Sequence, residues 1–269
     1  MSFQPVVPFG GFSGWSLLTR TMGDQRSVFD AAPQRQRLTE YFADKIGSIT
    51  TPEQLVEDRR LLTVALGAFG LSEDIDSRAF VARILSDGTS DPQALGNRLA
   101  DKRYLAMAEA FGFGEGTLPA TGRDGFAEGI VADYLERQFE VGVGEQNGDL
   151  RLALALQRDL GDIATKDTSD DAKWFTIMGQ PPLRRVFETA LGLPSSFGAI
   201  DLDQQLSTFR DRAERQFGIS EVADFADPEK MEALTRTFLL RAEIGAAPSP
   251  SIRGSTALAL LSQSTQPFG

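Results

Sequence analysis

The densest group of side chains that could carry out chemistry is the run Glu57-Asp58-Arg59-Arg60. Asp58 follows Leu55 by three residues and precedes Leu62 by four, so in one continuous helix it would lie on the apolar face. A carboxylate in that position must be neutralised by a cation, because its desolvation is otherwise very unfavourable. Two interpretations follow, a buried Asp–Arg network that joins helices and a catalytic carboxylate. No nucleophile or metal-binding side chain lies nearby in the sequence, so we favour the network.

The predicted ion-pair network consists of Asp58 and Arg59, with Arg98 and Arg103 as candidate partners from another part of the chain. Arginine suits this role because its planar guanidinium can pair with a carboxylate through two parallel hydrogen bonds. The sequence also contains far more arginine than lysine. We therefore expect arginines to be used mainly for ion pairs within and between helices.

Two other polar runs are weaker candidates for a site. Asp74, Asp76 and Asp87 do not follow the alternating pattern of an EF-hand calcium loop and lack its closing glutamate. Residues 112–116 are rich in glycine, but no strand precedes them and no Gly-Lys-Ser/Thr ending follows. The sequence therefore predicts no catalytic, cofactor-binding or metal-binding residues, and no cofactor.

The absence of cysteine and histidine excludes several classes of chemistry. Cysteine nucleophiles, disulfides, iron–sulfur clusters and haem held by His or Cys are ruled out. A zinc site of the usual Cys and His type is ruled out as well, and so is any mechanism that needs histidine as a base. Carboxylate, Ser-Lys and arginine chemistry remain.

The net charge of −11 at pH 7 argues against binding to nucleic acid, which requires a basic surface. It also disfavours anionic membrane surfaces. No apolar run approaches the ~20 residues of a membrane span, so we expect no membrane insertion. Residues 1–14 lack the basic and apolar regions of a cleavable signal peptide. We expect a cytoplasmic protein, with export through an uncleaved N-terminus as the alternative.

The ends of several helices can be recognised in the sequence. Thr51-Pro52-Glu53-Gln54 predicts a helix start, since Thr51 and Gln54 can form a capping box and Pro52 fits the first turn. Apolar-Gly-apolar stops, in which glycine can take the left-handed conformation, occur at 69–71, 111–113, 191–193 and 217–219. No convincing period-two alternation of strands is present. The predicted fold is an all-α multi-helix bundle of about ten helices.

We divide the chain into four parts. Residues 1–13 are predicted to be a flexible lead, and 246–269 a flexible tail rich in Pro, Ser and Ala. Between them, 14–115 and 124–245 are predicted to form an N-terminal and a C-terminal helical lobe packed on each other. Residues 61–71 resemble residues 183–193, which is consistent with two similar lobes or with the repeated use of one helix stop.

The candidates for partner binding are apolar residues near the two loosely predicted ends. They are Trp15 and Leu18 in the first helix, and Leu258 and Leu261 in the tail. Apolar segments of this kind can dock on a partner as short helices. The sequence does not specify the oligomeric state.

Three long runs carry a resemblance to a known family. They are GWSLLTRT (14–21), VEDRRLLTVALGAFGL (56–71) and RAFVARILSDGTSDPQALGNRLADKRY (78–104). They resemble the bacterial family of unknown function DUF1217, strongly over residues 10–115 and more loosely over the second half. The resemblance implies no catalytic residues. It implies an association with flagellar gene clusters, and some members carry the description of a flagellar rod protein.

Three functional hypotheses follow. We expect a non-enzymatic interaction protein with a protein partner, accessory to flagellar assembly or motility. The first alternative is an exported structural subunit of the flagellar rod or basal body, located there and not in the cytoplasm; the proline-broken tail, which lacks sustained heptads, makes it less favoured. The second alternative is a small-molecule enzyme that uses carboxylate or arginine chemistry, which should have a pocket with convergent ionisable groups and shifted pKa values.

Overall fold

The computed structural model describes residues 3–114, 116 and 118–246 and confirms the all-α prediction. Within these residues α-helices are joined by loops and short 3₁₀ helices, and no β-strand occurs. The α-helices are α1 (Gly11–Asp30), α2 (Pro33–Lys45), α3 (Pro52–Glu57), α4 (Arg59–Ala68), α5 (Arg78–Asp87), α6 (Leu95–Arg98), α7 (Arg103–Phe111), α8 (Phe126–Gly144), α9 (Gly148–Thr165), α10 (Asp170–Gly179), α11 (Pro181–Leu191), α12 (Leu202–Phe217) and α13 (Pro228–Ala246). No described helix combines the length and the apolar character that a bilayer crossing requires.

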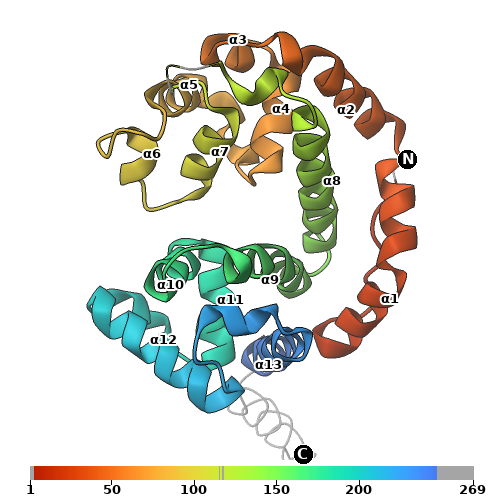
Figure 1. The fold of residues 1–269 in the computed structure, drawn as a ribbon. Helices are drawn as coiled ribbons and strands as arrows, with labels where there is room; N and C mark the ends of the chain where they lie inside the picture. Colours follow the sequence, from red (N-terminus) through yellow and green to blue (C-terminus); the bar gives the residue numbers. More distant parts are fainter. Residues whose placement is uncertain (1–2, 115, 117, 247–269) are drawn as a thin grey trace, which may run out of the picture.

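The helices form two lobes that share α8 (Figure 1). The core of the N-terminal lobe comes from α2 to α5 and α7, and that of the C-terminal lobe from α9 to α13. α8 contributes Ile130 and Tyr134 to the first core and Phe139 and Val143 to the second. One continuous helix therefore belongs to the cores of both lobes.

The structure differs from the predicted division of the chain at α1. This helix packs Trp15, Leu18 and Phe29 into the core of the C-terminal lobe, although it precedes the N-terminal lobe in sequence. Between α1 and α2 the chain crosses from the C-terminal lobe to the N-terminal lobe. It does so on the side of α8 that faces away from α5, α6 and α7 (Figure 1). A helix is placed by the core that its apolar face can reach, which position along the chain does not specify.

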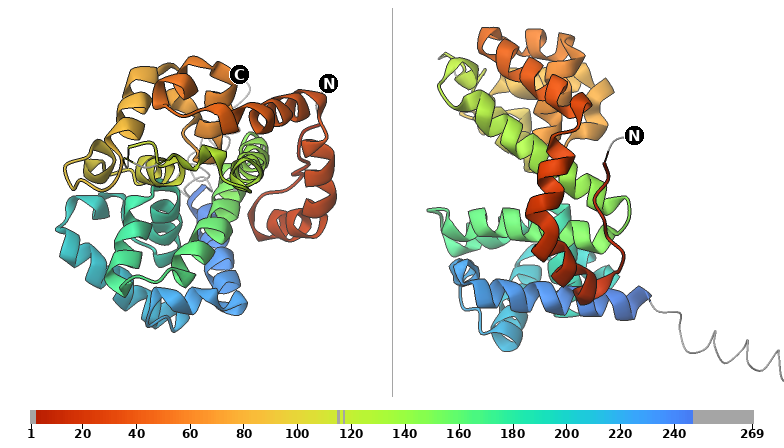
Figure 2. Two further views of the ribbon diagram at one scale, coloured as in Figure 1. Left: turned by 45° about the horizontal axis from the view of Figure 1, so that its top comes forward. Right: turned by 90° about the vertical axis from the view of Figure 1, so that its right-hand side faces the viewer.

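The segment before α1, predicted as a flexible lead, lies alongside this helix (Figure 2). The Val6 amide donates to Gln25 Oε1 at 2.6 Å, and the Pro5 carbonyl accepts from the side chain of Gln146 on the α8–α9 connection. Pro5 itself is buried. These contacts join residues 3–10 to both α1 and the end of α8.

The predicted helix signals are confirmed. Gln54 N–H donates to Thr51 Oγ1 at 3.4 Å, and Thr51 N–H donates to Gln54 Oε1 at 3.3 Å, which completes the capping box. The glycines of all four stops have φ between +63° and +70°. A 3₁₀ helix follows each stop before the next α-helix begins; these are Ser72–Asp76, Ala120–Gly122, Ser195–Ala199 and Val222–Ala226.

The two segments that resemble each other in sequence, 61–71 and 183–193, form α4 and α11 with their stops. Leu71 N–H donates to Leu66 O and Leu193 N–H donates to Glu188 O, both at 2.8 Å across the same sequence separation. Each lobe therefore contains one helix that ends in the same hydrogen-bonded turn.

Each of these helix ends also accepts a hydrogen bond from an arginine of the longest neighbouring helix. Arg137 of α8 donates to Ala68 O and Arg241 of α13 donates to Ala190 O, both at 2.6 Å. Ala68 and Ala190 occupy the same position before the glycine of the stop. These contacts support the interpretation of two similar lobes.

Replacement of Gly218 by alanine tests the role of the left-handed stops. Gly218 has φ +63°, and a Cβ atom there would meet no atom within 4 Å, so Gly218→Ala is expected to cost about 1 kcal/mol from backbone strain alone. Gly129, in the interior of α8, is equally open but helical, so Gly129→Ala should stabilise by about 0.5–1 kcal/mol. Urea unfolding of both variants measures the difference. Equal midpoints would contradict the assignment.

Candidate binding cleft between the two lobes

Asp58 does not lie on a continuous apolar face, because the helix predicted over 51–69 is broken at this residue. Asp58 is extended, with φ −86° and ψ 102°, and forms the N-cap of α4. Its Oδ1 accepts from the N–H groups of Arg60 at 2.9 Å and Leu61 at 3.2 Å, and the Tyr41 hydroxyl donates to its Oδ2 at 2.5 Å. Aspartate favours this position because its side chain satisfies amides that have no partner within the helix.

The predicted partners of Asp58 and Arg59 are therefore wrong. Among the described residues no hydrogen bond or ion pair joins Asp58 to Arg98 or Arg103. Arg59 pairs instead with Asp76 at 2.8 Å, and both side chains are more than half exposed. Asp58 thus caps the start of α4, because the break after α3 turns its side chain toward the first turn of that helix. Arg59 forms an exposed ion pair.

Hydrogen bonding decides the protonation of Asp58. Burial alone would raise the pKa of its carboxyl group, but the hydrogen bonds from Tyr41, Leu61 and Arg60 together lower that pKa below its ordinary value. The charged form of Asp58 therefore stabilises the folded state.

The candidates for partner binding also need correction. Trp15 and Leu18 are only 4% and 1% exposed, so they belong to the core of the C-terminal lobe and offer no docking surface. Leu258 and Leu261 lie outside the described residues.

A cleft lies between the lobes and is lined by residues of both of them. It contains two adjoining cavities of about 550 and 850 Å³. The residues that line both cavities are Phe69, Lys102, Ala106, Arg137, Arg158, Asp159 and Gln180. Gly179 of the C-terminal lobe lies close to Ala100 of the N-terminal lobe, so the two walls approach each other at this edge.

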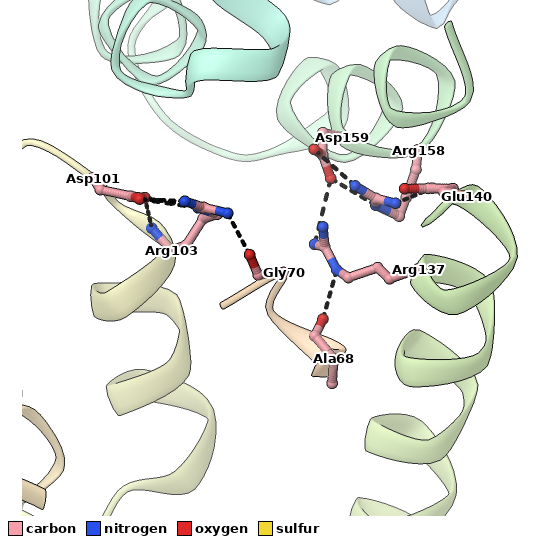
Figure 3. A network of polar contacts seen from close by, with 8 residues as sticks. All are labelled: Ala68, Gly70, Asp101, Arg103, Arg137, Glu140, Arg158 and Asp159. Atoms are coloured by element: carbon pink, nitrogen blue, oxygen red, sulfur yellow. Dashed lines mark hydrogen bonds and ion pairs between the residues drawn. The ribbon is translucent and has the colours of Figure 1, made fainter. Parts of the chain in front are cut away.

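Arginines and carboxylates of α8 and α9 form the floor of the cleft (Figure 3). Arg158 donates to Asp159 Oδ1 at 2.8 Å and is paired with Glu140, and the side chains of all three are largely buried. Arg137, besides its bond to Ala68 O, approaches Asp159 Oδ1 at 3.7 Å. One arginine thus links the end of α4 to α8 and α9.

The pKa values on the cleft floor reflect burial and pairing. Burial raises the pKa of Glu140, although the charge of Arg158 opposes this. For Arg158 burial acts to lower the pKa, but hydrogen bonds and charges of Asp159 and Glu140 outweigh it and raise the pKa. Burial and the neighbouring Arg158 lower the pKa of Arg137. The group is therefore a compact set of compensated charges.

A second polar group lines the wall formed by the N-terminal lobe. Arg103 pairs with Asp101 and donates to Gly70 O, two residues after the carbonyl of Ala68 that Arg137 binds (Figure 3). The Tyr104 hydroxyl donates to Asp74 Oδ2 at 2.7 Å. Burial and this hydrogen bond raise the pKa of Tyr104 to about 12. Arg103, predicted as a partner of Asp58, is thus used to close the α4 stop.

The wider part of the cleft is edged by carboxylates. Asp133 of α8 and Asp162 of α9 line the larger cavity, and burial is the main cause that raises the pKa of both. The charge of Asp159 further raises that of Asp162. Across the described residues, no group of three or more Asp or Glu is arranged to hold a metal ion. The cleft can offer hydrogen bonds and charge to a bound group, and two carboxyls that take up a proton more readily than usual.

Sequence reasoning missed the floor of the cleft. Its members are Arg137 and Glu140 of α8 and Arg158 and Asp159 of α9, and both helices are rich in apolar residues. Charged residues on an apolar helix must be paired, as we expected for Asp58, and the same expectation could have singled out these four residues. The spacing of residues along the chain does not indicate which helices pack together, so it could not predict that these residues meet.

Substitution of Asp58 tests the corrected role. Asp58→Ala should destabilise the protein by about 1–2 kcal/mol at neutral pH because α4 loses its cap, and Asp58→Asn should cost less because it keeps an acceptor. Since the pKa of Asp58 is lowered on folding, this contribution is present above the unfolded pKa and is lost as the pH falls through the folded pKa. The deficit of Asp58→Ala should therefore shrink in acid.

Asp76→Ala is the control, because Asp76 is an exposed carboxylate in a surface ion pair. Urea unfolding between pH 3 and pH 7 measures all variants. The assignment would be overturned if Asp58→Ala and Asp76→Ala unfolded alike at neutral pH.

Comparisons with known proteins agree with this architecture. The chain is similar to the crystal structure of protein AGR_C_984 from Agrobacterium tumefaciens, with 26% sequence identity and a TM-score of 0.73, over 91% of this chain and 100% of that one. A search among curated proteins found no significant match. The model of the family described as protein of unknown function (DUF1217) matches residues 68–231, which is more than half of the chain. The chain therefore belongs to the DUF1217 family.

Proposed function

We propose that this protein is a non-enzymatic interaction protein that holds a segment of a partner protein in the cleft between its lobes. The observation that carries the proposal is the state of the ionisable groups on the cleft floor. Arg137, Arg158 and Arg103 are occupied by carboxylates and by the carbonyls at the end of α4. Groups used in this way shape a rigid surface and are not free to act as acids, bases or nucleophiles.

The form of the cleft supports a polypeptide as the occupant. The two adjoining cavities share part of their lining, so we expect an extended or helical segment to lie across both of them. Its lining combines apolar side chains such as Phe69 and Phe175 with charged ones such as Lys166 and Glu109. Mixed surfaces of this kind are typical of protein interfaces that form and dissociate.

The cellular role that we propose is an accessory one in flagellar assembly or motility, in the cytoplasm. It is supported by membership of the family and by the gene association that the resemblance implies. A rod or basal-body subunit is the less favoured version. α1 and α13 are the first and last described helices, and they pack on each other within one lobe, whereas rod subunits usually pair terminal helices of heptad character along the axis of the assembled rod.

A small-molecule enzyme is the second candidate, and one observation favours it. Asp133 and Asp162 line a cavity of about 850 Å³ with raised pKa values, as general acids often do. A substrate bound beside these carboxyls would then be the occupant of the cleft.

Filling the cleft tests the proposal. Ala106 is exposed and lines both cavities, so Ala106→Trp should block the cleft without disturbing the core, and partners captured from the native cell by the wild type should be lost. Ala233→Trp is the control, because Ala233 is also exposed, on α13, and lines neither cavity. Affinity purification with mass spectrometry compares the three proteins.

The same variants separate the parts of the proposal. In a strain that lacks the gene, the wild type and Ala233→Trp should restore swimming, and Ala106→Trp should not. Normal swimming and filaments in the deletion strain would contradict the flagellar role. Equal capture of partners by both tryptophan variants would contradict the cleft as the binding site, and a small molecule retained only by the open cleft would favour the enzyme.

A further inference from the structure

The similarity of the lobes extends along α8 and α13. The arginines that bind the equivalent helix ends, Arg137 and Arg241, are 104 residues apart. The same offset pairs Tyr134 with Phe238, and it pairs Ile130 with Leu234. All four of these apolar residues are buried in their own lobe. The two helices can therefore be compared residue by residue.

Beyond the arginine, the two helices differ in what covers them. Glu140 of α8 is only 4% exposed, because α9 folds back along α8 and brings Arg158 against it. The equivalent residue of α13 is Ile244, which is 74% exposed. Leu240, one turn earlier on the same side of α13, is 43% exposed. α13 thus presents an apolar face at the position where α8 is covered by the next helix.

The sequence that follows α13 contains a counterpart of α9 at the same offset. In α9, Ala153-Leu154-Ala155-Leu156 packs into the core of the C-terminal lobe. The same four residue types recur 104 residues later, as Ala257-Leu258-Ala259-Leu260. This is the offset that relates Arg137 to Arg241, so the spacing from the arginine to the run is the same in both parts of the chain. Residues 247–269 lie outside the described structure.

We propose that residues 252–263 dock on the face of α13 formed by Leu240 and Ile244, in the place that α9 occupies on α8. The apolar run then covers two exposed apolar side chains, as the association of neighbouring repeats requires. The connection is long enough, because ten residues lie between the end of α13 and Ala257, whereas eight lie between the end of α8 and Ala153. Leu258, which the sequence marks as a candidate for partner binding, has the chain's own last described helix as its partner.

The offset of 104 residues predicts which two residues should be in contact when the segment docks on α13. Glu140 of α8 contacts Arg158 of α9, and adding 104 to each number gives Ile244 and Ser262. Ser264 is two residues further on, so in a helix packed like α9 it points away from α13. The chain has no cysteine, so pairs of introduced cysteines can be compared without interference.

The test is oxidative cross-linking of the full chain at low concentration. Ile244→Cys with Ser262→Cys should form an intramolecular disulfide at least about ten times faster than Ile244→Cys with Ser264→Cys. In a chain that does not dock, the two loops differ by two residues, and loop-closure entropy predicts almost equal rates. Adding Leu258→Ser to the faster pair should slow the reaction several-fold, because it weakens the docked state.

Two results would overturn the proposal. One is equal rates for the two serine positions, which would mean that no specific face of the segment contacts α13. The other is disulfides that join two molecules in place of intramolecular ones, which would mean that the face of α13 binds a second copy of the chain.

Discussion

The carbonyl groups at the end of α4 are the constraint on which the arrangement of the lobes depends. A helix end placed between two lobes loses contact with water, and its last carbonyls then need other donors. Arg137 and Arg103 supply those donors. Because Arg137 belongs to α8, which continues into the C-terminal lobe, the hydrogen bond that completes α4 also sets where the second lobe begins. The floor of the cleft is a consequence of this contact.

In the C-terminal lobe, an equivalent arginine donates to a carbonyl group at the end of α11. Arg241 of α13 binds the last turn of α11 as Arg137 binds that of α4, and Arg212 of α12 binds Leu191 O and Gly192 O. Because both lobes contain this contact between an arginine and a helix end, α8 and α13 can be compared residue by residue. The comparison identifies the exposed apolar face of α13. The boundary between the lobes, where charges must be paired out of water, is also where we propose that a partner binds.

Local features of the fold could be predicted from the sequence, whereas contacts between distant segments could not. The capping box at Thr51 and the stop at Gly70 depend on neighbouring residues only, and the structure contains both. The prediction for Asp58 was wrong because an aspartate between apolar residues is compatible with two structures. It can form a buried ion pair within one helix, or it can cap a new helix, as it does here. The pairing of Arg158 with Glu140 depends on how α9 folds back on α8, for which spacing along the chain holds no information.

The most direct test of this account compares the two equivalent arginines. Arg137→Met and Arg241→Met each leave a helix-end carbonyl without its donor, so each should lower the free energy of unfolding by about 1–3 kcal/mol. Amide hydrogen exchange should separate them: residues 68–71 should exchange faster only in Arg137→Met, and residues 190–193 only in Arg241→Met. An Arg137→Met protein with wild-type stability and unchanged exchange at residues 68–71 would contradict the central role of this contact.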